Sequence, residues 1–424
     1  MQSIHEELSW RGLIHQSTDE EHLAQWLVEQ PRTIYAGFDP TADSLHVGHL
    51  MAVMILRRFQ AFGHRPIALV GGATGMIGDP SGKSAERNLL GIDELRANVE
   101  SIKGQLARFL DFDAGALLVN NYDWMSEWSY LEFLRDIGKN FPVNVMLAKD
   151  SVKSRLERDD AGLSYTEFSY MLLQAYDFVR LHEMHGCNLQ VGGSDQWGNI
   201  TAGIDLARRM GFGQVYGITC PLLTKSDGGK MGKTESGAVW LDPARTSPYA
   251  FYQYWINVSD DDVGKCLRFL TEIPREEVEQ LDQARAEAPH EKASQKRLAE
   301  WLTQLVHGDE GLAKARRATE IFFGADIADL SDAELGEIFA DVPSREVPRA
   351  ELAAAQLTIV DALALTQLAK SKAEARRKVA EGGAYLNNHR VTDANQPLTA
   401  ADLASETVMV VRVGKKKYAL LKFV

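Results

Sequence analysis

Two histidines and two lysines have the types and the spacing for chemistry on phosphate groups. His46 and His49 lie three residues apart in a His-Val-Gly-His segment that follows a predicted strand and turn. A helix that begins there would offer backbone N–H groups and partial positive charge to an anion, and both imidazoles could donate hydrogen bonds to a leaving pyrophosphate. Lys230 and Lys233 lie in a glycine-rich segment and could neutralise the same charge in the transition state. Each segment taken alone also fits an ordinary solvated surface.

A stripe of polar side chains marks a predicted helix between these segments. Ser164 and Glu167 match a capping box, and Tyr170, Gln174 and Asp177 then recur at positions i, i+4 and i+7. The other faces of this helix are mostly apolar, so we expect it to be buried and its stripe to need partners. These partners are either other protein groups or a small polar ligand such as an amino acid. In the second case Asp177 could accept from a ligand hydroxyl, while Gln174 and Tyr170 could orient an ammonium group.

Alternating strands and helices predict the scaffold that positions these residues. Residues 33–38 predict a strand, a helix follows from about residue 46 to Gly63, and residues 66–70 predict a second buried strand. A strand, a helix and a strand within about forty residues predict a parallel sheet. A helix-rich stretch from about 121 to 187 precedes another predicted strand at 188–191. We therefore expect an α/β fold whose sheet has two halves.

Three other stretches bear on the organisation of the chain. Thr18 and Glu21 match a capping box, which predicts Thr18 as the N-cap of a helix that ends before Pro31. Helical periodicity dominates from about 248 to 323 and predicts a helical domain. Residues 325–350 are acidic and contain two prolines, which suggests a linker.

The charge is distributed unevenly along the chain. The 424 residues suggest about three domains at ~150 residues each, and their net charge is −13. Residues 351–424 hold eleven Lys/Arg and seven Asp/Glu, so this tail carries +4 and the preceding residues carry −17. The basic side chains could hold the phosphates of a polyanion, or they could simply keep the surface soluble. The residues concerned are Lys372, Arg376, Arg377, Lys415, Lys416 and Lys417.

Cysteine usage and hydropathy suggest the cellular compartment. The three cysteines show no Cys-x-x-Cys spacing, so neither a disulfide framework nor a thiolate zinc site is indicated. No run approaches the ~18 apolar residues that span a bilayer, and the amino terminus lacks a basic, apolar leader. We expect a cytoplasmic protein without a membrane partner, a metal site or a tightly bound cofactor.

Taken together, these segments resemble those of the bacterial tyrosyl-tRNA synthetases of class I. Residues 35–49 are similar to the "HIGH" region of that family, and residues 230–234 are similar to its "KMSKS" loop. Residues 78–83 and 192–199 also match family segments, so the likeness covers essentially the whole chain. The tail segments 371–377 and 382–387 resemble an S4-type RNA-binding domain.

The resemblance implies a role for individual residues. Tyr35 and Asp177 would hold the phenol of tyrosine. The residues implied at its ammonium group and along the rest of the pocket are Asp79, Tyr170, Gln174, Gln190 and Gln196. Those implied in pyrophosphate stabilisation are Thr41, His46, His49, Lys230, Lys233 and Thr234. Those implied in ATP binding are Gly37, Asp39, His46, His49, Gly193, Asp195 and Lys233. Lys83 and Arg87 would act near the phosphates or the tRNA end.

This sequence departs from the family pattern at a few positions. Ala36 stands where many members have a cysteine that contacts the ribose, which removes one side-chain contact to the nucleotide. Val47 replaces the usual isoleucine, and Gly232 and Thr234 replace the serines of the general loop signature.

The implied reaction is the charging of tRNA(Tyr). The carboxylate of tyrosine would attack the α-phosphorus of ATP, and a ribose hydroxyl at the 3′ end of the tRNA would then attack the tyrosyl-adenylate. Mg²⁺ would accompany ATP without dedicated protein ligands, and the family's homodimer would form through the helical stretch between the sheet halves. A tryptophanyl-type synthetase or another His-x-Gly-His nucleotidyltransferase is the enzyme alternative. A non-catalytic RNA-binding paralogue would keep the tail but lose the phosphate-binding side chains.

The resemblance also implies a division into domains. A Rossmann-like catalytic domain would span residues 1–222, with a helical insertion at about 121–187. The lysine loop and a helical anticodon-side domain would span 223–325, followed by the linker at 326–350. An S4-like α+β domain would span 351–424.

Overall fold

The computed structural model describes residues 3–81, 90–156, 162–234, 237–327, 330–339, 342–354, 356–415 and 417–424. The chain divides into two compact units. The first consists of Met1–Thr246 and Trp255–Val306, and the second of Ser247–Tyr254 and His307–Val424.

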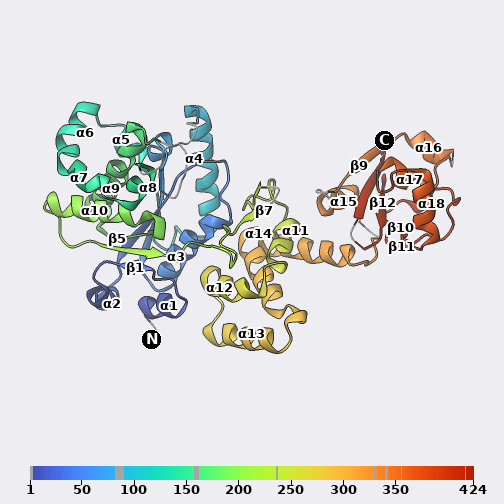
Figure 1. Ribbon diagram of the computed structural model, residues 1–424, viewed down its shortest axis with the longest axis horizontal. Helices are drawn as coiled ribbons and strands as arrows, with labels where there is room; N and C mark the ends of the chain where they lie inside the picture. The colour runs from blue at the N-terminus through green and yellow to red at the C-terminus, as the bar shows by residue number, and fades with distance from the viewer. Residues whose placement is uncertain are drawn as a thin grey trace. The chain divides into compact units, whose positions relative to one another are not determined.

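A six-stranded sheet forms the centre of the first unit (Figure 1). Its strands, in spatial order, are β1 (Gln16–Ser17), β6 (Tyr216–Cys220), β5 (Cys187–Gly193), β2 (Thr33–Phe38), β3 (Arg65–Val70) and β4 (Leu117–Asn120). All neighbours pair in parallel except β1, which is antiparallel to β6. The chain runs outward from β2 to β4 and then outward from β5 to β6, so the direction of winding reverses between β2 and β5. Ligands of open parallel sheets bind at this switch point, outside the carboxyl ends of the strands.

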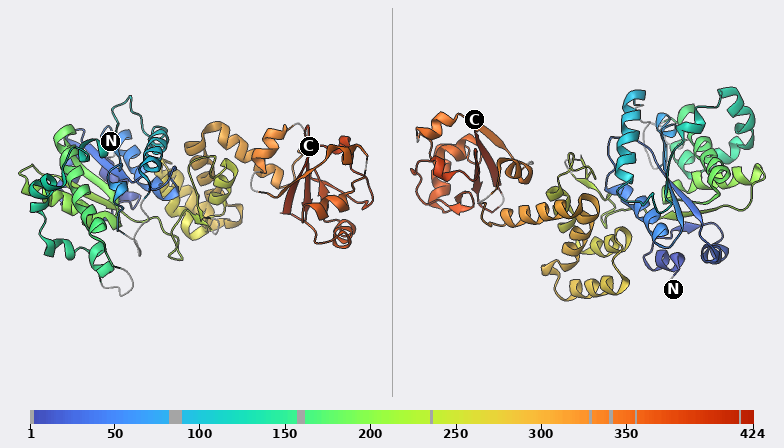
Figure 2. Two further views of the ribbon diagram at one scale, coloured as in Figure 1. Left: turned by 90° about the horizontal axis from the view of Figure 1, so that it is seen from above. Right: turned by 180° about the vertical axis from the view of Figure 1, so that it is seen from behind.

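Helices cover both faces of this sheet (Figures 1 and 2). α3 (Leu50–Ala61) and α4 (Ile92–Leu106) follow β2 and β3, whereas α9 (Tyr165–His185) and α10 (Trp197–Arg209) pack against each other and against β5. Successive strand side chains point to opposite faces, and Tyr35 and Ile67 accordingly belong to the cluster that contains Phe178 of α9 and Leu206 of α10. The helices between β4 and α9 are α5 (Tyr122–Met125), α6 (Tyr130–Asp136), α7 (Val143–Leu147) and α8 (Asp150–Leu156).

The helix starts only partly follow the capping patterns. Ser164 caps α9 by accepting from the backbone N–H of Glu167 at 3.2 Å. The Glu167 side chain instead pairs with Arg155 at 3.0 Å, and both side chains are 2% exposed. The prediction for Thr18 is wrong, because α2 (Glu20–Glu29) has Asp19 as its N-cap. The Thr18 hydroxyl accepts from the backbone N–H of Gly217 at 2.9 Å, so pairing with the edge of the sheet takes the oxygen that the helix would have used.

The rest of the first unit contains a short hairpin and several helices. The hairpin strands are β7 (Lys233–Thr234) and β8 (Gly237–Ala238), and the helices with described bounds are α1 (Ile4–Trp10), α12 (Asp260–Leu270) and α13 (Arg275–Glu287). Most of α11 (Pro248–Ile256) belongs to the second unit. α11 extends across the boundary between the units. So does α14 (Ala293–Phe322), which is broken at Gly308, where φ is 72°.

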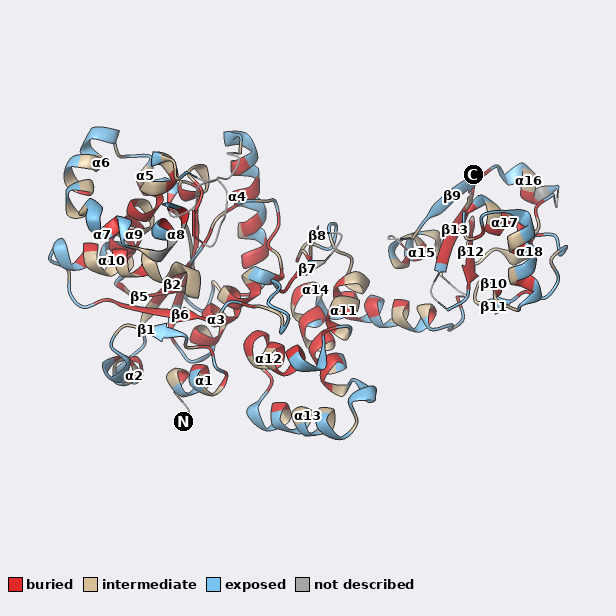
Figure 3. Ribbon diagram, in the orientation of Figure 1, coloured by how far each residue is buried: buried red, intermediate tan, exposed pale blue. Residues whose placement is uncertain are grey.

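The second unit is built on a five-stranded sheet. Its strands, in spatial order, are β11 (His389–Arg390), β10 (Ala384–Leu386), β12 (Val408–Val413), β13 (Lys417–Phe423) and β9 (Ser344–Val347). Its further helices are α15 (Asp332–Ile338), α16 (Arg349–Ala353), α17 (Ile359–Leu365) and α18 (Lys372–Ala380). Every residue of β12 is buried (Figure 3), because one face packs under α17 and α18 and the other packs on Phe339 and Tyr418.

The prediction that residues 326–350 form a linker is wrong, because this segment contributes a strand and core side chains to the second unit. β9 pairs in parallel with β13, and Leu335 of α15 and Phe339 lie in the same core cluster as Val408 and Tyr418. The segment is acidic and contains prolines, yet its apolar side chains and its strand are integral to the second unit.

None of the helices that the structure describes is long and apolar enough to cross a membrane.

Candidate active site

The two histidines follow β2 after the connection formed by residues 39–45, and they lie at the start of a helix. His46 precedes a single 3₁₀ turn, η1 (Val47–His49), which leads into α3. The Nδ1 atom of His46 accepts from the backbone N–H of Gly48 at 3.1 Å, and the Nδ1 atom of His49 accepts from the backbone N–H of His46 at 3.1 Å. The two rings stack with their centroids 4.0 Å apart. Since Nδ1 accepts in both neutral rings, Nε2 is the nitrogen that can donate to an anion.

The lysine segment is joined to the histidines by backbone pairing. Val47 N donates to Val239 O at 3.0 Å, Leu241 N donates to Leu45 O at 2.9 Å, and Val239 N donates to Gly232 O at 2.8 Å. Gly232 has a φ of 81°, and a Cβ atom there would lie 2.8 Å from the Cβ atom of Val47. Glycine is therefore required on both conformational and steric grounds, and the histidine segment and the lysine segment meet although they are far apart in the sequence.

A buried carboxylate on α9 and a buried phenol on β2 lie close enough to interact electrostatically. Asp177 is 1% exposed and accepts from Asn121 Nδ2 at 3.0 Å and from Trp124 Nε1 at 2.9 Å. Burial raises the pKa of Asp177 to about 7, against the opposing effect of these two hydrogen bonds. Burial, and then the charge of Asp177, raises the pKa of Tyr35, whose hydroxyl has no hydrogen-bond partner among the described residues.

This pair is suited to a ligand hydroxyl. Leaving a buried hydroxyl unpaired costs about 1–3 kcal/mol, so a ligand group that pairs with Tyr35 is favoured. Both Asp177 oxygens already accept from groups that can only donate, and an ionised carboxylate has lone pairs left for a further donor. A phenol O–H meets both requirements because it can donate to Asp177 and accept from Tyr35.

A second carboxylate binds Tyr170, the first residue of the polar stripe. Asp39, the first residue after β2, accepts from the Tyr170 hydroxyl at 2.8 Å and from the Thr74 hydroxyl at 2.7 Å. Burial and the charge of Asp39 raise the pKa of Tyr170 well above its usual value. Gly71 makes room for this arrangement, because a Cβ atom there would lie 2.1 Å from Asp39 Oδ1.

A chain of amide and carboxylate groups provides acceptors for a cation. Gln174 Nε2 donates to Gln196 Oε1 at 3.3 Å, and Gln196 Nε2 donates to Asp79 Oδ2 at 2.7 Å. Asp79 is 9% exposed, and its other oxygen accepts from the backbone N–H of Ser81 at 2.9 Å. Gln190 Oε1 is buried without a partner among the described residues. These oxygens form an electronegative wall that suits an ammonium group.

The residues predicted to bind ATP lie at or after the carboxyl ends of β2 and β5. Asp195 follows β5, and burial and the charge of Asp79 raise its pKa, while the charge of Lys230 opposes the rise. Asp195 therefore lies within electrostatic reach of the lysine segment. Gly37 and Thr41 are exposed, and Gly193 lies beside the carboxylate of Asp195.

The structure thus assembles most of the expected residues at one edge of the sheet. The expected tyrosine, ATP and phosphate residues come from β2, β5 and α9, from the segments that follow β2, β3 and β5, and from the histidine and lysine segments. Lys83 and Arg87 lie outside the described residues, and so does the side chain of Thr234. The sequence reasoning missed Asn121, Trp124, Thr74 and Asn199, which hold the predicted side chains in place. Asn121 follows β4 directly, so the rule that sites lie at carboxyl ends of parallel strands could have indicated it.

The basic residues of the tail lie in the second unit. Arg376 and Arg377 are exposed on α18, and Lys372 of the same helix pairs with Asp361 at 2.7 Å. Lys415 and Lys417 are exposed at the turn between β12 and β13, and Lys416 lies outside the described residues.

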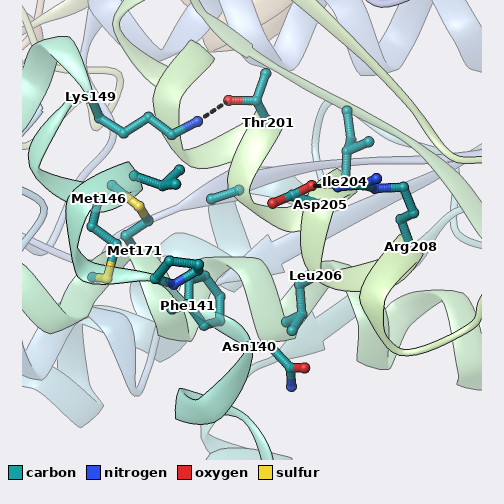
Figure 4. Close-up of a pocket in the computed structure, with 13 residues that line it drawn as sticks. Asn140, Phe141, Met146, Lys149, Met171, Thr201, Ile204, Asp205, Leu206 and Arg208 are labelled. Atoms are coloured by element: carbon teal, nitrogen blue, oxygen red, sulfur yellow. Dashed lines mark hydrogen bonds and ion pairs between the residues drawn. The ribbon is translucent and has the colours of Figure 1, made fainter.

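A separate cavity of about 260 Å³ lies between the helical insertion and α10 (Figure 4). Its lining includes Phe141, Met146 and Met171, and Lys149 donates to the Thr201 hydroxyl across it at 2.7 Å. None of the residues predicted for tyrosine or ATP lines this cavity. It is therefore distinct from the substrate residues at the switch point.

Comparison with known proteins identifies the family. The profile described as "tRNA synthetases class I (W and Y)" matches residues 28–324, and that described as "Tyrosine--tRNA ligase SYY-like C-terminal domain" matches residues 334–421. The chain belongs to the class I tRNA synthetases of the W and Y group. Both the predicted fold class and the predicted enzyme family are confirmed.

Full-length relatives within this family are tyrosine enzymes. The chain is 62% identical over 422 residues to the tyrosine--tRNA ligase of Rhodopirellula baltica, covering 99% of this chain and 96% of that protein. It is 51% identical to the tyrosine--tRNA ligase of Geobacillus stearothermophilus, covering 98% of this chain and 99% of that protein. The solved structure of a C-terminally truncated mitochondrial tyrosyl-tRNA synthetase from Aspergillus nidulans matches with a TM-score of 0.68 and 32% identity, covering 76% and 94% of the two chains. Tryptophanyl-tRNA synthetase from Encephalitozoon cuniculi, at 15% identity, shares the fold alone.

Proposed function

We propose that this chain activates tyrosine with ATP and transfers it to tRNA(Tyr). The observation that supports the proposal is the buried pair of Asp177 on α9 and the Tyr35 hydroxyl on β2, which has no hydrogen-bond partner among the described residues. A tryptophan side chain presents an indole N–H that could donate to Asp177 but has no acceptor for Tyr35. The tryptophan alternative is therefore disfavoured by the site chemistry as well as by the relatives.

The substrate tyrosine would lie along α9. Its phenol would donate to Asp177 and accept from Tyr35, and its ammonium group would meet the oxygens of Asp79, Gln174 and Tyr170. Gln190 and Gln196 would complete the wall of this pocket. The carboxylate would then point toward the ends of β2 and β5, where the α-phosphate of ATP must lie for reaction.

Adenylate formation would depend mainly on positioning and charge stabilisation. The tyrosine carboxylate attacks the α-phosphorus, the bond to the bridging oxygen breaks, and pyrophosphate leaves with the bridging electron pair. Because the carboxylate is already ionised at neutral pH, no general base is needed. The residues that we propose to stabilise the departing pyrophosphate are Thr41, His46, His49, Lys230, Lys233 and Thr234. Mg²⁺ would enter with ATP as part of the substrate.

The remaining nucleotide contacts would come from the strand ends. Gly37 lies in β2 and Asp39 follows that strand. Gly193 is the last residue of β5 and Asp195 follows it, and these two residues would lie near the ribose. Lys83 and Arg87 would approach the phosphates or the 3′ end of the tRNA.

The second unit would bind tRNA through its exposed basic side chains. Arg376 and Arg377 on α18 and the lysines at 415–417 are suited to phosphate contacts, which make binding depend on salt. This role suits a tail with a net charge of +4 attached to an acidic remainder.

We also propose that two chains associate through the helical insertion. Exposed apolar side chains gather on α6, α7 and the start of α9, among them Tyr130, Leu131, Val143 and Tyr165. Leu131 is 75% exposed, and a group of such residues is typical of an interface. Sedimentation of the wild type and of Leu131→Asp tests this point: a dimer that becomes a monomer supports the interface, and two identical profiles contradict it.

The function is tested by charging tRNA with labelled amino acid. Purified protein should attach tyrosine, and not tryptophan, to tRNA(Tyr) in a reaction that requires ATP. Attachment of tryptophan, or of neither amino acid, would contradict the proposal. We expect the activity in the cytoplasm, where the three buried cysteines would stay reduced.

A further inference from the structure

The lysine segment begins with a hairpin, residues 223–231, that is bound by a helix outside the sheet. In this first arm, Met231 N donates to Leu223 O at 3.0 Å and Lys225 N donates to Gly229 O at 2.8 Å. The second arm runs through Gly232 to the backbone pairing with the histidine segment. Lys230 and Lys233 therefore lie between two attachment points, and the position of the first arm helps to determine where they reach.

The attachment point of the first arm is the amino-terminal turn of α12. Asp262 accepts from the backbone N–H of Ser226 at 2.8 Å and from the Ser259 hydroxyl at 2.8 Å. The Ser226 hydroxyl lies 3.4 Å from the same carboxylate. One turn further on, Lys265 donates to the backbone carbonyl of Thr224. Two successive turns of α12 thus bind two positions of the loop.

The geometry around Asp262 indicates that its carboxylate stabilises the loop and does not cap its own helix. A carboxylate or serine in the first turn of a helix usually accepts from the helix's own N–H groups. Here the N-cap Ser259 makes no side-chain capping bond and instead donates to Asp262. Asp262 is 5% exposed, so its charge is taken out of water and directed at the backbone of another segment. Hydrogen bonds to an ionised group are the stronger kind and fix direction as well as distance.

We propose that Asp262 is a positioning residue that holds the lysine loop where Lys230 and Lys233 reach the departing pyrophosphate. This inference rests on the roles proposed for the two lysines. Without the carboxylate the hairpin samples other positions, so the lysines engage the transition state less often while the tyrosine pocket is unchanged.

The test compares variants of two neighbouring aspartates in the full-length protein. Asp262→Ala removes the anchor, and Asp261→Ala removes the same charge from the same helical turn, where Asp261 is exposed. We expect Asp262→Ala to slow single-turnover formation of tyrosyl-adenylate about tenfold at saturating ATP, with an unchanged Kd for tyrosine. Asp261→Ala should stay within about twofold of the wild type. Asp262→Asn keeps the shape and a neutral acceptor, so it should fall between them and serves if the alanine variant does not fold.

A double-mutant cycle separates positioning from a general structural effect. If Asp262 acts through the two lysines of the loop, its loss should change the rate by no more than about twofold in a background that combines Lys230→Ala with Lys233→Ala. Additive losses, or a parallel loss of tyrosine affinity, would overturn the inference. If Lys230→Ala and Lys233→Ala slow the reaction while Asp262→Ala does not, the inference alone fails. If the lysine variants react at the wild-type rate, the lysine roles proposed above fail and the inference fails with them.

Discussion

Replacing Trp124 by phenylalanine removes one hydrogen bond from Asp177, the carboxylate that we propose binds the phenol of tyrosine. The indole N–H donates to Asp177 Oδ1 at 2.9 Å, and the ring itself is only 4% exposed. Phenylalanine keeps most of the packing but not the donor. A hydrogen bond to a charged group contributes about 1.5–3 kcal/mol, which corresponds to a rise of about 1–2 in the pKa of Asp177.

The expected effect on substrate binding follows from that rise. Tyrosine binding needs the ionised carboxylate, so affinity should fall as the pH falls through the pKa of Asp177, which is about 7 in the wild type. With a pKa of about 8–9 in the variant, the ionised fraction at about pH 7.5 drops from roughly three quarters to between a quarter and a few per cent. Tyrosine should then bind about 3- to 25-fold more weakly at that pH and recover most of its affinity above about pH 9.

The assay is equilibrium dialysis of labelled tyrosine between about pH 6 and 9.5, a range that brackets the expected pKa values. Trp128→Phe is the matched control, because that indole packs on Tyr176 with ring centroids 5.6 Å apart. Its pH profile should follow the wild type. A Trp124→Phe variant whose affinity is reduced equally at every pH would refute the reasoning, because the loss would then come from packing and not from ionisation.

Three further predictions follow from the same geometry. His46→Ala combined with His49→Ala should lower kcat for adenylate formation about a hundredfold or more with little change in the KM for tyrosine, as steady-state pyrophosphate exchange would show; a full kcat would end their assignment. Gly232→Ala should also slow exchange, because the added methyl group meets Val47 at a position with φ of 81°, and an unchanged rate would mean that the loop does not act in the position described. Truncation after Gly324, which removes all of β9 to β13, should leave exchange intact and abolish tRNA charging, whereas equal loss of both activities would show that the second unit is needed for folding.

The truncation point illustrates what the sequence could not predict. A cut near residue 345 follows from treating residues 326–350 as a linker, but it would leave α15 behind without the strands on which Leu335 and Phe339 pack. The strand at 344–347 has only four residues, three of them exposed, and its partner β13 begins about seventy residues later. The residue pattern of this segment alone does not predict the pairing, since a strand of this kind is stabilised by its partner strand and not by its own sequence.

The site was predictable to the extent that its chemistry is local. His46, His49 and the stripe on α9 are each set by spacing within one segment, and the structure places them at the edge of the sheet that the βαβ pattern indicates. Asn121 and Trp124 both contact Asp177, more than fifty residues later in the chain, and Asn121 also binds Ala73 and Thr74 of a different segment. Thr18 fits a helix cap locally, but its hydroxyl pairs with β6 instead. Side chains whose partners are distant in sequence were missed for this reason.

The central claim is that the buried pair at the switch point selects tyrosine for activation by ATP. The most direct measurement is ATP–pyrophosphate exchange with each of the twenty amino acids in turn, at equal concentration and without tRNA. Tyrosine should support exchange, and tryptophan and phenylalanine should give none above background. Exchange driven by tryptophan, or equal exchange with phenylalanine, would contradict the claim.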